Sequence, residues 1–473
     1  MWRLSRHAAY IVVCSLPVYT ALYPGVELLP GNLFKFSVGN STTVECDVKK
    51  IIGGLLCFCL LACSQDQSNH SSTPVTPTAD NGAGNGNSQL SIHRQALTLD
   101  THVDISFDFA TAKEDPLTAD IQASLEKMEA GGLDAAFFIV YVGQAERTPE
   151  NYAKAHADAL TKFIAIHRMA HELYPDRIGL AYTPADVEKL VAEAKLAAMI
   201  GIENGVVIGK DIDLLDKYFD LGARYMTLVH NGHNDLGDSA QPREQLGDKA
   251  SEHDGLSEFG IAAVKRMNKL GMMVDISHVS KATAIHAMAT STAPVIASHS
   301  SVSGVYPHPR NFDDETLDKL KENGGVIQIV AFSAYLKAVP SEYTEARRAL
   351  NALYGFEDRP DIESLDEKTR TEYSREVDEL NQRYPGANVG DLVDHIDYAV
   401  KRIGIDHVGI SSDFGGGGGI AGWRDASETP NVTAELEKRG YSTEDIGKLW
   451  GGNLLRVWRE VEDLAHQAPS VDE

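Results

Sequence analysis

Several short apolar segments of this chain end in a histidine or a carboxylate. VDISH ends at His278, and PVIASH ends at His299 about twenty residues later. LTLDTHVDI holds His102 and Asp104 two residues apart, so both side chains point to one side of an extended chain. LAAMIGIENG places Glu203 after another apolar run. Three imidazoles and two carboxylates are suited to a hydrolytic centre with two metal ions, in which one carboxylate bridges the ions.

These residues need a scaffold that brings distant strand ends together. From residue 97 onward, short apolar segments alternate with amphipathic helical patterns, several of which are closed by glycine. The predicted strands are 97–105, 133–142, 196–203, 224–230, 272–278, 294–299, 324–331 and 407–413. Eight strands alternating with helices predict an α/β fold, a (β/α)8 TIM-type barrel.

The positions of the polar residues agree with this barrel. Active sites of such barrels are built at the carboxyl ends of the strands. The residues at or near the predicted strand ends are His102, Asp104, Glu203, His230, His278, His299 and Asp413. We therefore expect these seven residues to meet at one face.

The predicted barrel domain spans residues 95–466 and carries one insertion. Residues 333–388 are charged and mostly helical, and they separate the seventh strand from the eighth. Two interpretations stay open: a cover over the mouth of the barrel, or a solvated helical decoration without contact to substrate.

The amino-terminal region has the pattern of a bacterial lipoprotein signal. Lys49 and Lys50 precede the apolar run IIGGLLCFCLLAC, which ends at Cys63. We interpret residues 1–63 as a leader and lipoprotein signal, with Cys63 as the acylated residue. We hypothesise that translation begins at Val48; an ordinary signal segment at residues 8–23 is the alternative. The expected location is the cell envelope, lipid-anchored and facing the periplasm, in the outer membrane.

Composition narrows the classes of function. Residues 64–94 are rich in Ser, Thr, Asn, Gly and Pro and predict a flexible tether. A formal charge of -25 over 473 residues leaves no basic surface for phosphates, which argues against nucleic-acid binding. All five cysteines lie in the first 63 residues, so a metal in the barrel must be held by nitrogen and oxygen.

An ordered series of motifs resembles the membrane dipeptidase (renal dipeptidase) family, peptidase family M19, metallopeptidases of the wider amidohydrolase group. The resemblance extends from about residue 95 to about residue 460. The motifs are DTHVDI, GIENG, RYMTLVHN, VDISHVS, SHSSVSGVYPHPRN, VGISSDF and GGNLLRVW. The resemblance implies a zinc peptidase that cleaves dipeptides with a metal-bridging hydroxide, and that tolerates a D-residue at the carboxyl-terminal position.

The resemblance also implies roles for individual residues. His102 and Asp104 would bind one zinc ion, His278 and His299 the other, and Glu203 would bridge the two. His230 would contact the substrate beside the scissile carbonyl, Arg310 would receive the terminal carboxylate, and Asp413 would transfer the proton. A homodimer is a further implication. One departure is Gly415, at a position where members of the family commonly have a second aspartate.

Alternatives stay open. His230 could merely cap its strand, and Arg310 could be a surface arginine that pairs with Asp313 or Asp314. For the whole chain, one alternative is an N-acyl amino acid deacylase or another amidohydrolase on the same two metal ions. The other is an inactive barrel that acts as an envelope binding lipoprotein.

Overall fold

The computed structural model describes residues 26–29, 33–38, 42–47, 92–356 and 365–467, which belong to two compact units. The first unit contains an antiparallel sheet of three strands, β1 (Val26–Leu29), β2 (Leu33–Val38) and β3 (Thr42–Asp47). These strands lie inside the segment interpreted as a leader. Val48, Cys63 and most of the predicted tether lie outside the described residues.

Eight parallel strands of the second unit form a nearly closed barrel, as predicted. In spatial order they are β4 (Leu99–Asp104), β5 (Ala135–Tyr141), β7 (Leu196–Glu203), β8 (Ala223–Thr227), β9 (Met273–Asp275), β10 (Ile296–Val302), β12 (Val326–Val330) and β13 (Val408–Ser411). The last strand meets the first through the backbone, because the Asp104 N–H donates to the Phe414 carbonyl over 2.7 Å.

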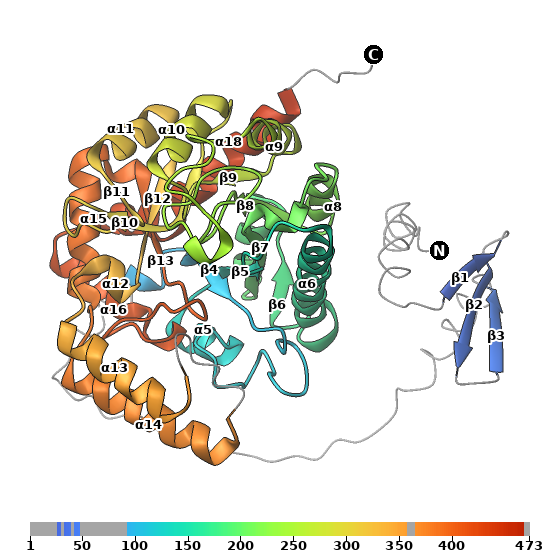
Figure 1. Cartoon of the computed structure of the whole chain (residues 1–473), viewed down its shortest axis with the longest axis horizontal. Helices are drawn as coiled ribbons and strands as arrows, with labels where there is room; N and C mark the ends of the chain where they lie inside the picture. Colours follow the sequence, from blue (N-terminus) through green and yellow to red (C-terminus); the bar gives the residue numbers. More distant parts are fainter. Residues whose placement is uncertain (1–25, 30–32, 39–41, 48–91, 357–364, 468–473) are drawn as a thin grey trace, which may run out of the picture. The chain divides into compact units, whose positions relative to one another are not determined.

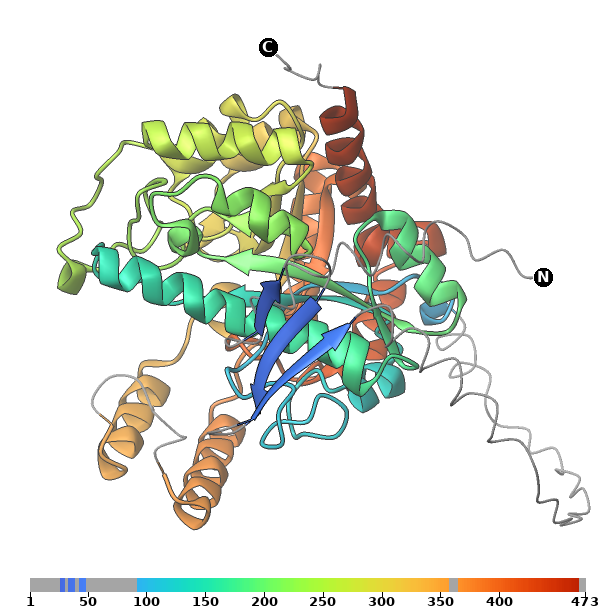
Figure 2. The ribbon, with the colours of Figure 1, turned by 90° about the vertical axis from the view of Figure 1, so that its right-hand side faces the viewer.

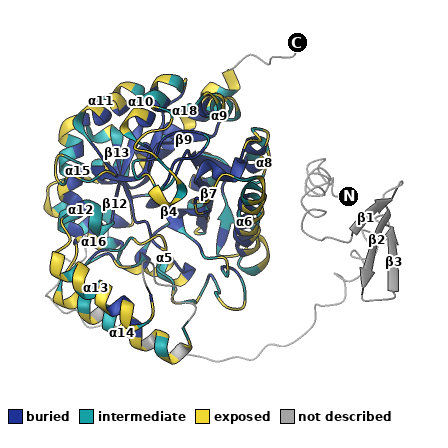
Figure 3. Cartoon of the chain, in the orientation of Figure 1, coloured by how far each residue is buried: buried dark blue, intermediate teal, exposed yellow. Residues whose placement is uncertain are grey.

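Helices surround the strands, and their outer faces are exposed while the strands are buried (Figures 1 and 3). The helices outside the insertion are α5 (Leu125–Gly131), α6 (Pro149–Arg168), α7 (Pro184–Ala192), α8 (Leu214–Asp220), α9 (Glu258–Leu270), α10 (Lys281–Thr290), α11 (Asp314–Asn323), α15 (Val389–Ile403), α16 (Pro430–Lys438), α17 (Thr443–Gly447) and α18 (Asn453–Gln467). Local chemistry sets their ends: α9 starts after Ser257, whose side chain caps the Gly260 N–H, and ends at Gly271.

A separate apolar cluster joins the inward-facing strand residues to the last helix. Phe137 of β5 packs against Tyr225 of β8, with ring centroids 5.0 Å apart, and against Trp458 of α18, 5.8 Å away. All three side chains are fully buried. The functional residues at the carboxyl ends of the strands therefore rest on a packed interior.

Several predicted strand ends are wrong in detail. β8 ends at Thr227, three residues before His230, so His230 lies in the loop that follows the strand. β9 ends at Asp275, whose side chain accepts a hydrogen bond from the Ser277 N–H over 3.0 Å, and His278 beyond it has a left-handed backbone with φ 66°. β10 instead continues past His299 to Val302. The structure also contains two short strands that were not predicted. They are β6 (Ile178–Leu180), which pairs with β7, and β11 (Asn311–Phe312), which pairs with β10.

The insertion is helical, as predicted, and contains α12 (Ser333–Leu336), α13 (Ser341–Leu353) and α14 (Glu367–Arg383). The last two pack around a small core of Leu350, Phe356 and Tyr373, and they project from the barrel (Figure 2). Among these described helices, only α12 lines, through Tyr335, a cavity at the carboxyl ends of the barrel strands. Among the described residues, no helix is long and apolar enough to span a membrane.

Candidate metal centre and active site

The five predicted metal ligands meet at the carboxyl ends of the barrel strands. Glu203, the last residue of β7, lies between two sets of side chains. Its Oε1 atom is 3.0 Å from Nε2 of His278 and 3.2 Å from Nε2 of His299. Its Oε2 atom is 3.7 Å from Nε2 of His102, which in turn is 3.4 Å from Oδ2 of Asp104. The two oxygens of one carboxylate thus face two different groups of ligands.

A tyrosine orients the His102 ring. The Tyr225 hydroxyl donates to the Thr101 carbonyl over 2.9 Å, so it accepts a hydrogen bond from Nδ1 of His102, 3.0 Å away. The proton of the neutral imidazole then lies on Nδ1, and the lone pair of Nε2 points toward the carboxylates.

The other two imidazoles are oriented in the same way. The Ser298 hydroxyl donates to the buried Asp275 carboxylate over 2.6 Å, and therefore accepts from Nδ1 of His299 over 2.8 Å. Nδ1 of His278 donates to the Asn231 side-chain oxygen over 3.2 Å. Both Nε2 atoms are thus left with lone pairs, and they lie 2.9 Å apart.

This donor set fits metal cations. Nε2 of His102 and Oδ1 of Asp104 are buried without a hydrogen-bond partner in the described part of the chain. Three sets of side chains bring their ligand atoms within 4.8 Å of one another: His102, Glu203 and His299; Glu203, His230 and His278; His102, Asp104 and Asp413. Imidazole nitrogens and carboxylate oxygens that converge in this way are the environment that a divalent cation stabilises.

The electrostatics of the ligands point the same way. Burial disfavours a charged His102, but Glu203 and Asp104 outweigh burial and raise the His102 pKa well above its usual range. Burial lowers the pKa of His278 and of His299 well below the usual value, and Arg310 adds to the effect at both. The carboxylates around His102 therefore stabilise a positive charge at that position. His278 and His299 stay neutral, and a neutral imidazole can bind a metal.

Asp413 lies beside this cluster, two residues after β13. Its Oδ1 atom is 4.0 Å from Nε2 of His102, and its backbone is left-handed, with φ 58°. Burial raises the Asp413 pKa well above its usual value, and the Asp104 and Glu203 carboxylates add to that rise.

Asn204 and His278 have positive φ, as Asp413 does, so three of the six non-glycine residues with positive φ in the described chain adjoin the site.

His230 lies against the cluster of predicted metal ligands and does not merely cap a strand. Its ring is 4.1 Å from that of His278, and its Nε2 atom is 3.9 Å from Oε1 of Glu203. Burial lowers the His230 pKa to about 4, so the ring is neutral at neutral pH. The Tyr141 hydroxyl is 3.5 Å from Nδ1; a ring that accepts this hydrogen bond carries its proton on Nε2.

Arg310 is buried, with 2% of its surface exposed, so it is not the surface arginine of the alternative interpretation. One guanidinium nitrogen donates to the His299 carbonyl over 3.0 Å, and the group lies 5.3 Å from the ring centroid of Tyr335. The Arg310 Nε atom has no partner in the described chain. Asp313 and Asp314 pair instead with Lys281 and Arg402.

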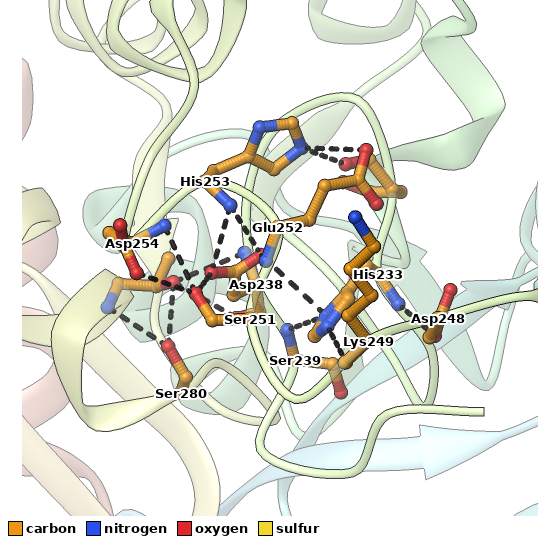
Figure 4. A network of polar contacts seen from close by, with 12 residues as sticks. His233, Asp238, Ser239, Asp248, Lys249, Ser251, Glu252, His253, Asp254 and Ser280 are labelled. Carbon is orange, nitrogen blue, oxygen red and sulfur yellow. Dashed lines mark hydrogen bonds and ion pairs between the residues drawn. The ribbon is translucent and has the colours of Figure 1, made fainter. Parts of the chain in front are cut away.

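The loop between β8 and α9 that carries His230 is fixed by a polar network around Asp238 (Figure 4). The Asp238 carboxylate accepts hydrogen bonds from the Ser251 hydroxyl over 2.7 Å and from two backbone N–H groups, those of Glu252 and His253. Ser239 connects the loop to the site, because its hydroxyl donates to the His230 carbonyl over 2.5 Å. His233 accepts a hydrogen bond from the Ser239 N–H, and its Nε2 atom contacts the Lys249 carbonyl.

The structure explains the departure at Gly415. This residue has φ 78°, and a Cβ atom there would lie 2.5 Å from the Asp104 carbonyl oxygen. The glycine run therefore packs against the strand that carries the predicted ligands His102 and Asp104. An aspartate at this position requires a different course of the loop.

A cavity of about 520 Å³ opens over these residues. Its wall includes three side chains that sequence did not single out: Tyr141, Lys162 and Tyr335. Tyr141 ends β5, and this position is a signal that could have been used, because it is a polar residue at a strand end. Lys162 and Tyr335 come from helices, and no sequence pattern separates them from ordinary helical residues.

Comparisons with known proteins agree with this site. Residues 87–472 match the family model of membrane dipeptidase (peptidase family M19). Dipeptidase tcpJ of Claviceps purpurea is 33% identical over 366 residues, which cover 76% of this chain and 74% of that protein. Dipeptidase verJ of Clonostachys rogersoniana is 34% identical, with 74% and 78% covered. The crystal structure of the probable dipeptidase PvdM from Pseudomonas aeruginosa matches with a TM-score of 0.70 and 34% identity, covering 80% of this chain and 98% of that one.

Proposed function

Because this chain belongs to the membrane dipeptidase family and is a metallodipeptidase, we propose that it hydrolyses dipeptides at a centre of two zinc ions. The single observation that carries the proposal is the position of Glu203. Its two oxygens face separate groups of ligands, His278 and His299 on one side and His102 on the other. A carboxylate placed in this way suits the bridge between two ions.

The remaining ligands follow from the same geometry. His102 and Asp104 would hold one ion, and His278 and His299 the other. When bound, the two ions lower the pKa of a water molecule and polarise the peptide carbonyl. Asp413, beside His102, takes the proton of the attacking water and passes it to the leaving amine. Nε2–H of His230 donates to the carbonyl oxygen as negative charge develops on it.

Arg310 would receive the carboxylate at the end of the substrate. A guanidinium group binds a carboxylate with two parallel hydrogen bonds; Arg310 donates to the His299 carbonyl, and its Nε atom has no partner in the described chain. An anchor at a fixed distance from the metal centre favours dipeptides over longer peptides. Because this anchor recognises the end group and not the side chain, we also propose that a D-residue is tolerated at the carboxyl-terminal position.

Metal analysis combined with a panel of L,L and L,D dipeptides tests the proposal. We expect two zinc ions per chain and hydrolysis of both classes. Cleavage of N-acyl amino acids but of no dipeptide would favour the deacylase alternative. Metal-loaded protein that cleaves nothing in the panel would favour a binding lipoprotein.

A histidine substitution sharpens the test. His278→Ala should abolish activity while the fold is retained. His407→Ala is the matched control, because His407 precedes β13 and so lies at the opposite end of the barrel from the site. Equal activity of the two variants would contradict the proposed ligand role of His278.

We also propose that lipidation at Cys63 anchors the enzyme in the cell envelope, facing the periplasm. The support is the sequence pattern before Cys63. Mass spectrometry of the mature amino terminus tests it: a lipidated peptide that begins at Cys63 is expected, and an unlipidated peptide from residues 1–47 would contradict it.

We also propose a homodimer, as the family resemblance implies. Size-exclusion chromatography with light scattering tests this proposal.

A further inference from the structure

Lys162 is a buried lysine in the wall of the active-site cavity. It lies on α6, and 3% of its surface is exposed. Among the residues that the structure describes, its ammonium group makes no hydrogen bond or ion pair within 4 Å. Its close contacts are the rings of Phe107 and Tyr141, whose centroids lie 5.1 Å and 5.6 Å from Nζ. Buried lysines are rare without an anionic partner, so this one requires an explanation.

Lys162 and Arg310 lie on opposite sides of the barrel. Lys162 packs against Tyr141 at the end of β5, whereas Arg310 contacts His299 and Ser300 of β10. In the order of the eight strands, β5 and β10 are four strands apart in either direction. The metal ligands lie between these two cationic groups.

The electrostatic surroundings of Lys162 leave its charge only partly compensated. Burial lowers the Lys162 pKa, and the carboxylates of Asp104, Glu203, Asp158 and Glu114 together offset only part of that effect. Metal ions bound by Asp104 and Glu203 would neutralise these two carboxylates and weaken the compensation. An anion that entered the cavity would therefore gain a charge-assisted hydrogen bond at Lys162.

We propose that Lys162 binds an acidic side chain on the amino-terminal residue of the dipeptide substrate. The inference rests on the proposed function, in which the terminal carboxylate goes to Arg310 and the scissile carbonyl lies over the metal centre. The amino-terminal residue then extends toward the β5 side of the cavity. The α-ammonium group of that residue is repelled by Lys162, whereas an Asp or Glu side chain is attracted.

A different reading makes Lys162 an internal counter-ion that balances Asp104 and Glu203 without touching substrate. The two readings differ in what they predict for substrates of equal size. A counter-ion affects all dipeptides alike, because it acts through the metal site. A binding residue affects only substrates that carry the anionic side chain.

Kinetics with isosteric substrate pairs tests the proposal. The pairs are Glu-Ala with Gln-Ala and Asp-Ala with Asn-Ala, assayed with zinc-loaded, full-length protein. We expect kcat/KM to be about ten- to a hundredfold higher for the acidic member of at least one pair, the range for one hydrogen bond to a charged group. Lys162→Met should remove this preference and leave hydrolysis of the amide member nearly unchanged, while Lys162→Arg should keep part of the preference.

The controls separate the possible failures. Lys154→Met changes an exposed lysine of the same helix and should behave as the unmodified protein. Equal rates on both members of each pair, a preference that survives in Lys162→Met, or an equal loss on all four substrates would each overturn the inference. If no dipeptide is cleaved by metal-loaded protein, it is the proposed function that fails, and the inference fails with it.

Discussion

The Nε2 atoms of His278 and His299 lie 2.9 Å apart, and both rings direct their Nδ1 hydrogens to other acceptors. Two lone pairs therefore face each other, with the Glu203 carboxylate 3.0 Å and 3.2 Å away. A cation removes this repulsion, so the folded state gains stability when the metal is bound.

Metal removal should lower the stability of the fold. At a free zinc concentration a thousandfold above Kd, binding stabilises the folded state by about 4 kcal/mol. We expect chelation to lower the melting temperature by roughly 5 °C or more and added zinc to restore it. Calorimetry with and without chelator measures the effect, and His278→Ala should reduce the difference. A melting temperature that is insensitive to chelation in protein shown to have lost its metal would contradict the proposed centre.

Tyr225→Phe should weaken the metal site while the fold is retained. The substitution removes the hydroxyl that accepts from Nδ1 of His102 and keeps the ring that packs on Phe137. We expect a loss of about 10- to 100-fold in zinc affinity or in kcat/KM, as for other partners that orient metal-bound histidines. Competitive titration with a zinc indicator measures the affinity.

Tyr218→Phe is the matched control for that experiment. Tyr218 lies on α8, which carries none of the proposed ligands. Its hydroxyl is also buried, but it donates to the Val207 carbonyl over 2.9 Å. The prediction for Tyr225 is wrong if the two variants have the same zinc affinity.

Sequence patterns predicted the barrel and the convergence of the proposed ligands, but not the geometry between them. The ligands were accessible because strand ends in a parallel barrel converge, so HxD in DTHVDI and the terminal histidines of VDISH and PVIASH imply proximity. The exact strand ends could not be predicted from sequence, since Asp413 and His278 have left-handed backbones that depend on tertiary packing. Lys162 was missed for a similar reason: α6 is amphipathic, and only the packed structure shows that this lysine is on its buried side.

Gly415→Asp should impair the enzyme, although aspartate is common at this position in the family it resembles. The new Cβ atom would collide with the Asp104 carbonyl oxygen, 2.5 Å away, and would displace a metal ligand. We expect lower zinc affinity and a loss of roughly 1–3 kcal/mol in stability. Gly440→Asp introduces the same backbone strain at φ 89° where nothing lies within 4 Å of a Cβ atom. If the two variants lose the same stability and both retain zinc affinity, the collision with Asp104 is not the cause.

The Asp238 network should give the His230 loop a stability that depends on pH. Burial raises the Asp238 pKa, but hydrogen bonds from the Ser251 hydroxyl and from the Glu252 and His253 N–H groups outweigh it and lower the pKa below its ordinary value of 3.8. A carboxyl group whose pKa is lower in the folded state stabilises the protein above the unfolded pKa. That contribution is lost as the pH falls through the folded pKa.

Asp238→Asn should therefore be less stable than the unmodified protein at pH 5–7, and the difference should shrink below about pH 4. The amide cannot accept all the hydrogen bonds that the carboxylate receives. Urea unfolding at several pH values measures the difference, and Asp176→Asn, at an exposed carboxylate, is the control that should show no change. Because the Ser239 hydroxyl donates to the His230 carbonyl, the same variant should also lower kcat at neutral pH. A stability difference that stays constant from pH 7 to pH 3 would show that the Asp238 charge does not hold the loop.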